Sequence, residues 1–251
     1  MEIVAQTDIG NVREVNQDYV LYHKKNEHEC LAVLCDGMGG HNAGEIASSL
    51  ACQDIIKFYQ LHDEFKSEEE IQTWMSEVIY HANQFLQEKS HLDKELEGMG
   101  TTVVLALFKD GYVYISHVGD SRAYFFDNHQ LIQLTKDDTL VNALVESGSI
   151  SLDEAQFHPQ KNILLQAVGV SEVLKISFYK QMIGNGIILL CSDGLYNSLF
   201  DEQIIEVLDQ YKTLNEKGSH LMEMANIFGG RDNIGIILMW DKGVVNNESD
   251  K

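Results

Sequence analysis

Four aspartates in this sequence each lie at one end of a short apolar run. An ionised carboxylate near apolar surroundings costs several kcal/mol unless a cation or hydrogen-bond donors compensate it. One interpretation is a plain turn, because Asp-Gly is a common turn dipeptide. The recurrence of four such ends, three with an adjacent glycine, instead favours a shared site. The four are Asp36 after LAVLC, Asp120 in HVGDSR, Asp193 after IILLCS and Asp232 before IGIILMW.

Carboxylates that converge without histidine or cysteine form an all-oxygen site, which suits hard cations such as Mg²⁺ or Mn²⁺. Without a cation, several close carboxylates would repel one another and take up protons. Two ions bridged by one aspartate would keep the carboxylates ionised, lower the pKa of a bound water and orient it for in-line attack on phosphorus. No loop carries the alternating ligands and closing glutamate of an EF-hand, so that calcium motif does not explain the aspartates.

The N-terminal loop TDIGNVREVNQD adds a candidate anion contact. It contains Asp8, Arg13 and Asp18, and Arg13 is one of three arginines in the chain, with Arg122 and Arg231. An arginine in a short acidic loop is compatible with a surface ion pair that contributes little to stability. It is equally compatible with a bidentate clamp on a phosphate group. The sequence leaves both interpretations open.

Hydrophobic periodicity predicts the elements that must position these residues. The period changes from helical spacing to two between residues 101 and 135, where short turns allow only antiparallel neighbours. The expected helices are 45–59, 71–86 with a capping box at Ser67 and Glu70, 139–147, one capped by Asp201 with Tyr211 inward, and one with a box at Thr213 and Glu216 and Phe228 on its apolar face. The expected strands are 2–7, 19–22, 31–35 (paired with 19–22 as a hairpin), 103–108, 112–117, 123–126, 131–134, 163–168, 174–179, 187–191 and 234–240.

This order of strands and helix pairs predicts an α+β fold, a four-layer α-β-β-α sandwich of two antiparallel sheets flanked by helix pairs. In antiparallel sheets the end of one strand lies beside the start of its neighbour, so Asp193 and Asp232 are expected on one edge. Asp36 and Asp120 join them there if their strands run in the direction of the Asp193 strand. Residues 1–242 are expected to form a single domain, followed by a polar tail, 243–251; residues 148–162 are an irregular candidate flap.

The composition narrows the class of partner and the compartment. The chain of 251 residues has a net charge of −21, which argues against nucleic acid or an anionic membrane as the main partner. The N-terminus lacks the pattern of a secretory signal, and no apolar run approaches the ~20 residues of a membrane span. The four cysteines form no C-x-x-C pair, and three lie in or beside apolar runs. Buried free thiols in a reducing cytoplasm are therefore expected.

Seven motifs, in order, carry a family resemblance: TDIGNVREVNQD, DGMGGHNAGEIAS, GMGTT, HVGDSRAY, HPQKNILLQAVG, LLCSDGL and GGRDNIG. From about Glu2 to Trp240, the sequence closely resembles the metal-dependent protein serine/threonine phosphatases of type 2C (the PPM family), most of all the short bacterial members. The resemblance implies the same α-β-β-α sandwich. It also implies direct hydrolysis of phosphoserine or phosphothreonine by a metal-bridged hydroxide, on phosphoprotein substrates and in opposition to a cognate serine/threonine kinase.

The resemblance further implies which residues bind metal. Asp36 would bridge two Mn²⁺ or Mg²⁺ ions, and the Gly37 carbonyl would contribute to one of them. Asp193 and Asp232 would complete the other, which makes these three aspartates the expected catalytic ligands. Asp120, together with Asp193, would hold a third, weaker ion.

Two further roles follow from the same resemblance. Arg13 would bind the substrate phosphate, and Asp18 would act on the metals through bound water. The flap, here 146–162, would lie next to the third ion. A catalytically silent binding module on the same fold is the alternative from another class, but it would be expected to have lost a metal aspartate or the arginine. All are present.

The sequence departs from the family pattern at some positions. Many eukaryotic members carry a histidine, proposed as the general acid, where this chain has Met38. That position supplies no acid here, so the proton for the leaving group is expected from metal-bound water. His41 and His158 lie within motifs, and a structural role is expected for them ahead of a catalytic one. Asp138 stands where bacterial relatives often have histidine, so no role is transferred to its loop.

Overall fold

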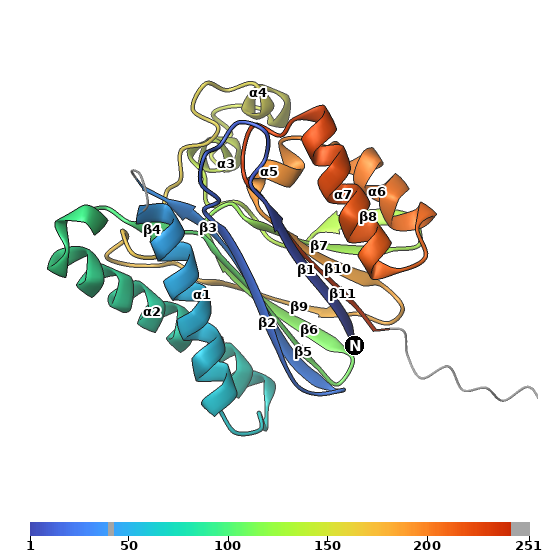
Figure 1. Cartoon of the computed structure of the whole chain (residues 1–251), viewed down its shortest axis with the longest axis horizontal. Helices are drawn as coiled ribbons and strands as arrows, with labels where there is room; N and C mark the ends of the chain where they lie inside the picture. The colour runs from blue at the N-terminus through green and yellow to red at the C-terminus, as the bar shows by residue number, and fades with distance from the viewer. Residues whose placement is uncertain (40–42, 242–251) are drawn as a thin grey trace, which may run out of the picture.

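Two antiparallel sheets lie face to face at the centre of the protein, as the computed structural model shows for residues 1–39 and 43–241 (Figure 1). The first sheet has the order β1 (Glu2–Asp8), β11 (Ile234–Trp240), β10 (Ile187–Cys191), β7 (Arg122–Asp127) and β8 (Gln130–Gln133). The second has the order β2 (Asp18–Asn26), β3 (Glu29–Met38), β5 (Val103–Lys109), β6 (Tyr112–Val118) and β9 (Ser177–Met182), with β4 (Gly100–Thr101) beside β3. The expected tail and His41 lie outside the described residues.

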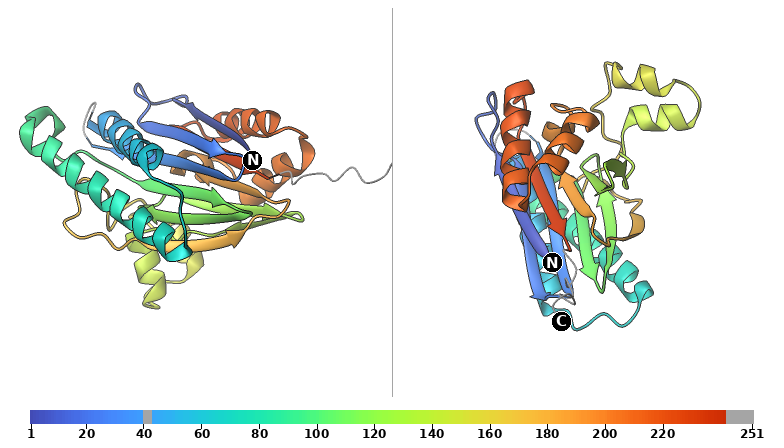
Figure 2. Two further views of the ribbon diagram at one scale, coloured as in Figure 1. Left: turned by 90° about the horizontal axis from the view of Figure 1, so that it is seen from below. Right: turned by 90° about the vertical axis from the view of Figure 1, so that its right-hand side faces the viewer.

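Helices cover both outer faces, which confirms the four-layer α-β-β-α sandwich (Figures 1 and 2). One apolar core lies between the second sheet and its helices, one between the first sheet and its helices, and a third between the two sheets. The helices on the second sheet are α1 (Ala43–Leu61) and α2 (Glu68–Leu92), followed by the short η1 (Lys94–Leu96). Those on the first sheet are α5 (Asp193–Tyr196), α6 (Asp201–Gln210) and α7 (Leu214–Phe228). Two short helices stand apart from the sheets, α3 (Leu140–Glu146) and α4 (Leu152–Gln156).

Strand β3 does not stop before Asp36 as expected. It pairs with β2 as the predicted hairpin, but it continues through Asp36 to Met38. The last two residues pair with β4, which places Gly37 opposite Thr101. A two-residue strand carries no readable period, so the sequence did not indicate the partner that extends β3. Asp36 is therefore fixed inside a strand rather than in a turn.

The expectation that all four strands between residues 101 and 135 are neighbours is wrong at one turn. The β5–β6 and β7–β8 hairpins form as predicted, but β6 and β7 belong to different sheets. The chain crosses between the sheets at Gly119, whose φ is +103°. A Cβ there would lie 2.7 Å from Thr102 Cγ2, so only glycine fits this crossing. The crossing brings Asp120 to the edge shared by both sheets.

Three other strand or loop expectations need correction. Residues 163–168 are not a strand; Leu164 and Val168 form only isolated bridges. The strand expected at 174–179 is β9, which begins later, at Ser177. The flap is not wholly irregular, because Ser151 and Glu154 form a capping box that starts α4.

The helix ends also differ in detail. Ser67 Oγ accepts the Glu70 N–H as predicted, but the Glu70 carboxylate accepts the N–H of Lys66, so the capping box is only half formed. The cap of α6 is Phe200, and Asp201 is the first helical residue. The box of Thr213 with Glu216 on α7 is confirmed. Phe228, expected on the apolar face, is exposed because it lies at the helix end.

Two expectations about the chain as a whole can be compared with residues 1–39 and 43–241. No helix within these residues is both long and apolar enough to cross a membrane. All four cysteines are unpaired and buried, as predicted.

Candidate active site

The second sheet supplies Asp36 and Asp18. The two face each other across the β2–β3 pairing. Two threonines fix the backbone of Asp36: Thr102 Oγ1 accepts its N–H at 3.0 Å, and Thr101 Oγ1 donates to its carbonyl at 2.9 Å. Beside it, a Cβ on Gly37 would lie 2.0 Å from the Gly44 carbonyl oxygen, so this position excludes every residue except glycine. The backbone of Asp36 is thus held by two hydroxyl groups and, at Gly37, by close packing against residue 44.

The first sheet and the crossing supply the other carboxylates. Asp193 follows β10 and begins α5, and Asp232 lies two residues before β11. The antiparallel β10–β11 pairing brings these positions to one edge, as expected from the sequence. Ser192 Oγ then joins the two sheets, because it donates to Asp18 Oδ2 at 2.5 Å and accepts the Gly235 N–H at 2.8 Å.

The electrostatics show that these aspartates share one region. Burial raises the pKa of Asp36 well above its ordinary value, and the charges of four neighbours raise it further. The four neighbours are Asp18, Asp193, Asp120 and Asp232. Burial is also the main cause that raises the pKa of Asp193 to about 8, of Asp18 to about 7 and of Asp120 to about 6. The structure therefore brings together the five aspartates that the sequence singled out.

The donor set suits a hard divalent cation. The charges that raise the pKa of Asp36 come from carboxylates, the ligands that Mg²⁺ and Mn²⁺ prefer. Asp18 Oδ1 is buried and has no hydrogen-bond partner, so it has an unused lone pair. In the described part of the chain, no three acidic, histidine or cysteine side chains already surround one point closely enough to hold an ion. Like charges keep such side chains apart, and cations between them would remove that repulsion.

Arg13 lies at the open side of the acidic cluster. Its Nη2 donates to Asp232 Oδ2 at 2.8 Å, and half of its side chain remains exposed. This hydrogen bond is the main cause that raises the pKa of the guanidinium, which is therefore fully charged. The contact shows that Arg13 reaches the carboxylates from the loop between β1 and β2. The structure thus shows Arg13 in an ion pair with Asp232, and its binding of a phosphate stays a prediction.

Asn233 holds the loop that carries Arg13. Its Nδ2 donates to the carbonyls of Ile9 and Val15 at 2.9 and 3.0 Å, and its Oδ1 accepts the Gln17 N–H at 2.9 Å. The side chain is buried and closes both arms of the loop beside Asp232. Sequence reasoning missed this residue, although its place directly after Asp232 in GGRDNIG was a signal.

We expect Asn233→Ala to lower kcat/KM about tenfold, because the loop that carries Arg13 loses three partly buried hydrogen bonds, each worth roughly 1 kcal/mol to its folded position. The loss should nearly vanish in an Arg13→Ala background, where the position of the loop no longer matters. A double-mutant cycle on a phosphopeptide measures this coupling. Asn83→Ala is the matched control, since Asn83 is a buried clamp of residues 169–171. Additive losses of Asn233→Ala and Arg13→Ala would contradict the positioning role.

The remaining candidate residues lie outside the cluster. Asp138 accepts the N–H of Gly119 and the side-chain amide of Gln166, so it braces the crossing between the sheets. His158 Nδ1 accepts the Gln160 N–H, beyond the end of α4. Met38 is partly exposed at the end of β3. Ser192 and the two threonines were not predicted, because hydroxyl residues in apolar runs carry no distinct signal.

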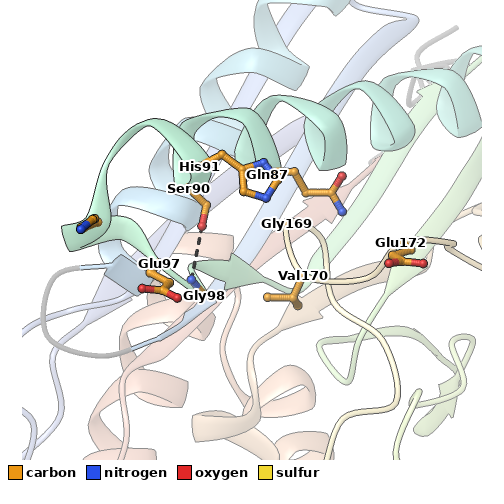
Figure 3. Close-up of a pocket in the computed structure, with 9 residues that line it drawn as sticks. Gln87, Ser90, His91, Glu97, Gly98, Gly169, Val170 and Glu172 are labelled. Carbon is orange, nitrogen blue, oxygen red and sulfur yellow. Dashed lines mark hydrogen bonds between the residues drawn. The ribbon is translucent and has the colours of Figure 1, made fainter.

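A cavity of about 630 Å³ lies elsewhere, between the C-terminal part of α2 and residues 169–172 (Figure 3). Gln87, His91 and Ser90 point into it from the helix, and Glu97, Val170 and Glu172 lie opposite. None of the five clustered aspartates lines it. The acidic site lies instead at the edge where the two sheets meet.

Comparison with known proteins agrees with this fold. The sequence model of the protein phosphatase 2C family matches residues 11–227. A serine/threonine phosphatase of Listeria monocytogenes is 37% identical over 240 residues, which is 95% of each chain. The structure of the Streptococcus agalactiae serine/threonine phosphatase superposes with a TM-score of 0.90 at 36% identity, over 94% of this chain and 98% of that one. The catalytic domain of the phosphatase PstP, solved with two manganese ions, gives a TM-score of 0.80 at 31% identity, over 94% and 96%.

The chain belongs to the protein phosphatase 2C family. It is a protein serine/threonine phosphatase of the bacterial type, as the resemblance of its motifs implied.

Proposed function

We propose that this phosphatase hydrolyses phosphoserine and phosphothreonine in proteins with Mn²⁺ or Mg²⁺ held by its buried aspartates. The burial of Asp36 among four other carboxylates carries the proposal. Asp36 would bridge two ions, the Gly37 carbonyl would complete one, and Asp193 and Asp232 the other. Asp120 would join Asp193 around a third. The related PstP domain with two manganese ions supports the first pair.

The ions would supply a hydroxide bridged between them as the nucleophile, and would offset the charge of the phosphate. The chain's own residues bind and orient the substrate. Arg13 is exposed on one side and would bind two phosphate oxygens, because its planar guanidinium matches that geometry. Asp18 is held by Ser192 and keeps one oxygen free to accept a hydrogen bond from water in the site. Met38 has no proton to donate, so residue 38 is not the general acid.

The test is hydrolysis of a phosphothreonine peptide by the purified protein. Activity should require added Mn²⁺ or Mg²⁺, be abolished by EDTA and return when the metal is restored. Calorimetric titration should show saturable binding of the ion. Full turnover in EDTA after dialysis would overturn the metal assignment, and a peptide left intact in saturating Mn²⁺ would overturn the substrate class.

The stability of the metal-free protein should fall as the pH rises from 5 to 8. Asp193 and Asp18 have folded-state pKa values of about 8 and about 7, against an ordinary value of 3.8. The folded state therefore binds more protons than the unfolded state in this window, so the stability it gains at low pH is lost as these carboxylates ionise. Thermal melts in EDTA should give a lower Tm at pH 8 than at pH 5. Added Mn²⁺ should raise Tm by several degrees at pH 8 and far less at pH 5, where protons compete. An equal rise at both values would contradict this.

We also propose that the enzyme acts in the cytoplasm, in signalling, against a serine/threonine kinase. The four unpaired buried cysteines support a reducing compartment. A phosphoproteome comparison with and without the enzyme, and with and without a candidate kinase, tests the opposition. Phosphorylation sites whose occupancy rises without the phosphatase should lose occupancy without the kinase.

A further inference from the structure

Five large apolar side chains are exposed on three segments that meet beside the acidic site. They lie on the β1–β2 loop, at the C-terminal end of α7 and at the start of α6. We call this surface the apolar rim: Ile9, Val12, Phe200, Ile227 and Phe228, which are 39 to 78% exposed. Single exposed apolar residues are ordinary on protein surfaces, but several on adjoining segments indicate a binding surface.

Specific contacts hold the three segments together. The Asn11 N–H donates to the Gly230 carbonyl at 2.7 Å, and Asn11 Nδ2 donates to the Asn226 carbonyl at 2.8 Å. A Cβ on Gly229 would lie 2.2 Å from Ser198 Oγ, so the chain leaving α7 touches the segment that leads into α6. Figure 1 shows the β1–β2 loop beside the upper end of α7. The three segments that carry the rim are therefore neighbours in the folded protein.

The rim is continuous with the phosphate-binding position. Val12 adjoins Arg13, which reaches Asp232, and Phe228 is four residues before Asp232 along the chain. Exposed charges of both signs lie here, because Glu14 adjoins Arg13, and Asp201 and Glu202 follow Phe200. The chain has a net charge of −21, and two of its three arginines, Arg13 and Arg231, are exposed here, whereas the third is paired with Asp137. A segment that carries a phosphate at Arg13 would thus pass over the apolar side chains beside it.

We propose that the apolar rim binds apolar side chains that flank the phosphorylated residue of a protein substrate. The inference rests on the proposed binding of phosphate by Arg13. The rim then selects among phosphoproteins, while the acidic site performs the same hydrolysis on all of them. Small phosphate esters cannot reach the rim, so they report the chemistry alone.

The test compares two phosphothreonine peptides, one with leucine and phenylalanine beside the phosphorylated residue and one with serine there, alongside p-nitrophenyl phosphate. The wild type should prefer the apolar peptide at least tenfold in kcat/KM, mainly through KM. Ile227→Ser with Phe228→Ser should remove most of this preference and leave turnover of p-nitrophenyl phosphate within twofold. Leu61→Ser with Leu92→Ser is the matched control, since both residues are equally exposed on helices of the other face. The control should keep the full preference.

Three outcomes would overturn the proposal. The wild type could treat both peptides alike, or the rim variant could keep the preference. The rim variant could also change only the oligomeric state in sedimentation, with unchanged peptide kinetics, which would make the rim a contact between copies of the chain. Failure of the proposed function looks different, because p-nitrophenyl phosphate would then not be hydrolysed in a metal-dependent way by any variant.

Discussion

Asp36→Asn should lower kcat on phosphopeptides and on p-nitrophenyl phosphate by about 10³-fold or more, which corresponds to about 4 kcal/mol of transition-state stabilisation. An amide lacks the charge and the second anionic oxygen needed to bridge two cations. Asp193→Asn should show a loss of similar size. Steady-state kinetics at saturating Mn²⁺ measures both, and calorimetry should show weakened binding of the ion.

The same substitution should not unfold the protein. Asp36 is buried among carboxylates that raise its pKa, so the neutral asparagine removes repulsion from the metal-free state. Its Tm in EDTA at pH 8 should equal or exceed that of the wild type. Asp63→Asn is the control, because Asp63 is exposed at the far end of α1 and lies outside the cluster. Retained activity in Asp36→Asn would remove the basis for the metal site.

Arg13→Ala should reduce kcat/KM on phosphopeptides by about 30-fold, with KM carrying most of the change. Hydrogen bonds to charged groups contribute roughly 1.5–3 kcal/mol, and the guanidinium would make two with the phosphate. Arg13→Lys should recover only part of the loss, because a point charge cannot bind two oxygens in parallel. Initial-rate kinetics at fixed ionic strength separates the variants.

The control for Arg13 is Lys57→Ala, which removes an exposed cation on α1 far from the cluster. It corrects for the effect of net charge on the approach of an anionic substrate. If Arg13→Ala left both KM and kcat unchanged, the arginine would be a surface ion pair with Asp232 and nothing more.

The sequence predicted the sandwich because its helices and its strands repeat apolar residues at different intervals. The apolar spacing of α2 and the strong strand signals of β5, β10 and β11 left few arrangements that bury every apolar face. It did not predict which turn leaves a sheet. Gly119-Asp120-Ser121 has the composition of a hairpin turn, and only the order of strands in the two sheets shows that the chain crosses there. Long-range contacts of this kind have no signature in a short window.

The acidic residues of the site could be predicted from the sequence for a related reason. Asp36, Asp193 and Asp232 interrupt or flank apolar runs, where a charge is costly and therefore conspicuous. The residues that orient them could not be predicted from the sequence. Asn233 acts on three backbone groups that lie more than two hundred positions away in the chain, and Ser192 acts on a carboxylate of the opposite sheet. Such partners come together only when the two sheets pack against each other in the folded protein.

The hydrogen bond that Ser192 makes to the opposite sheet has a mechanical consequence. Asp18 and Asp36 belong to one sheet, Asp193 and Asp232 adjoin strands of the other, and the Ser192 hydroxyl bonds across this edge to Asp18. A cation bound by both pairs would cross-link the two sheets of the sandwich. Loading the protein with metal should then slow amide hydrogen exchange in β10 and β3 together. Conversely, a substitution that leaves a cavity between the sheets, far from any carboxylate, should weaken the binding of the ion.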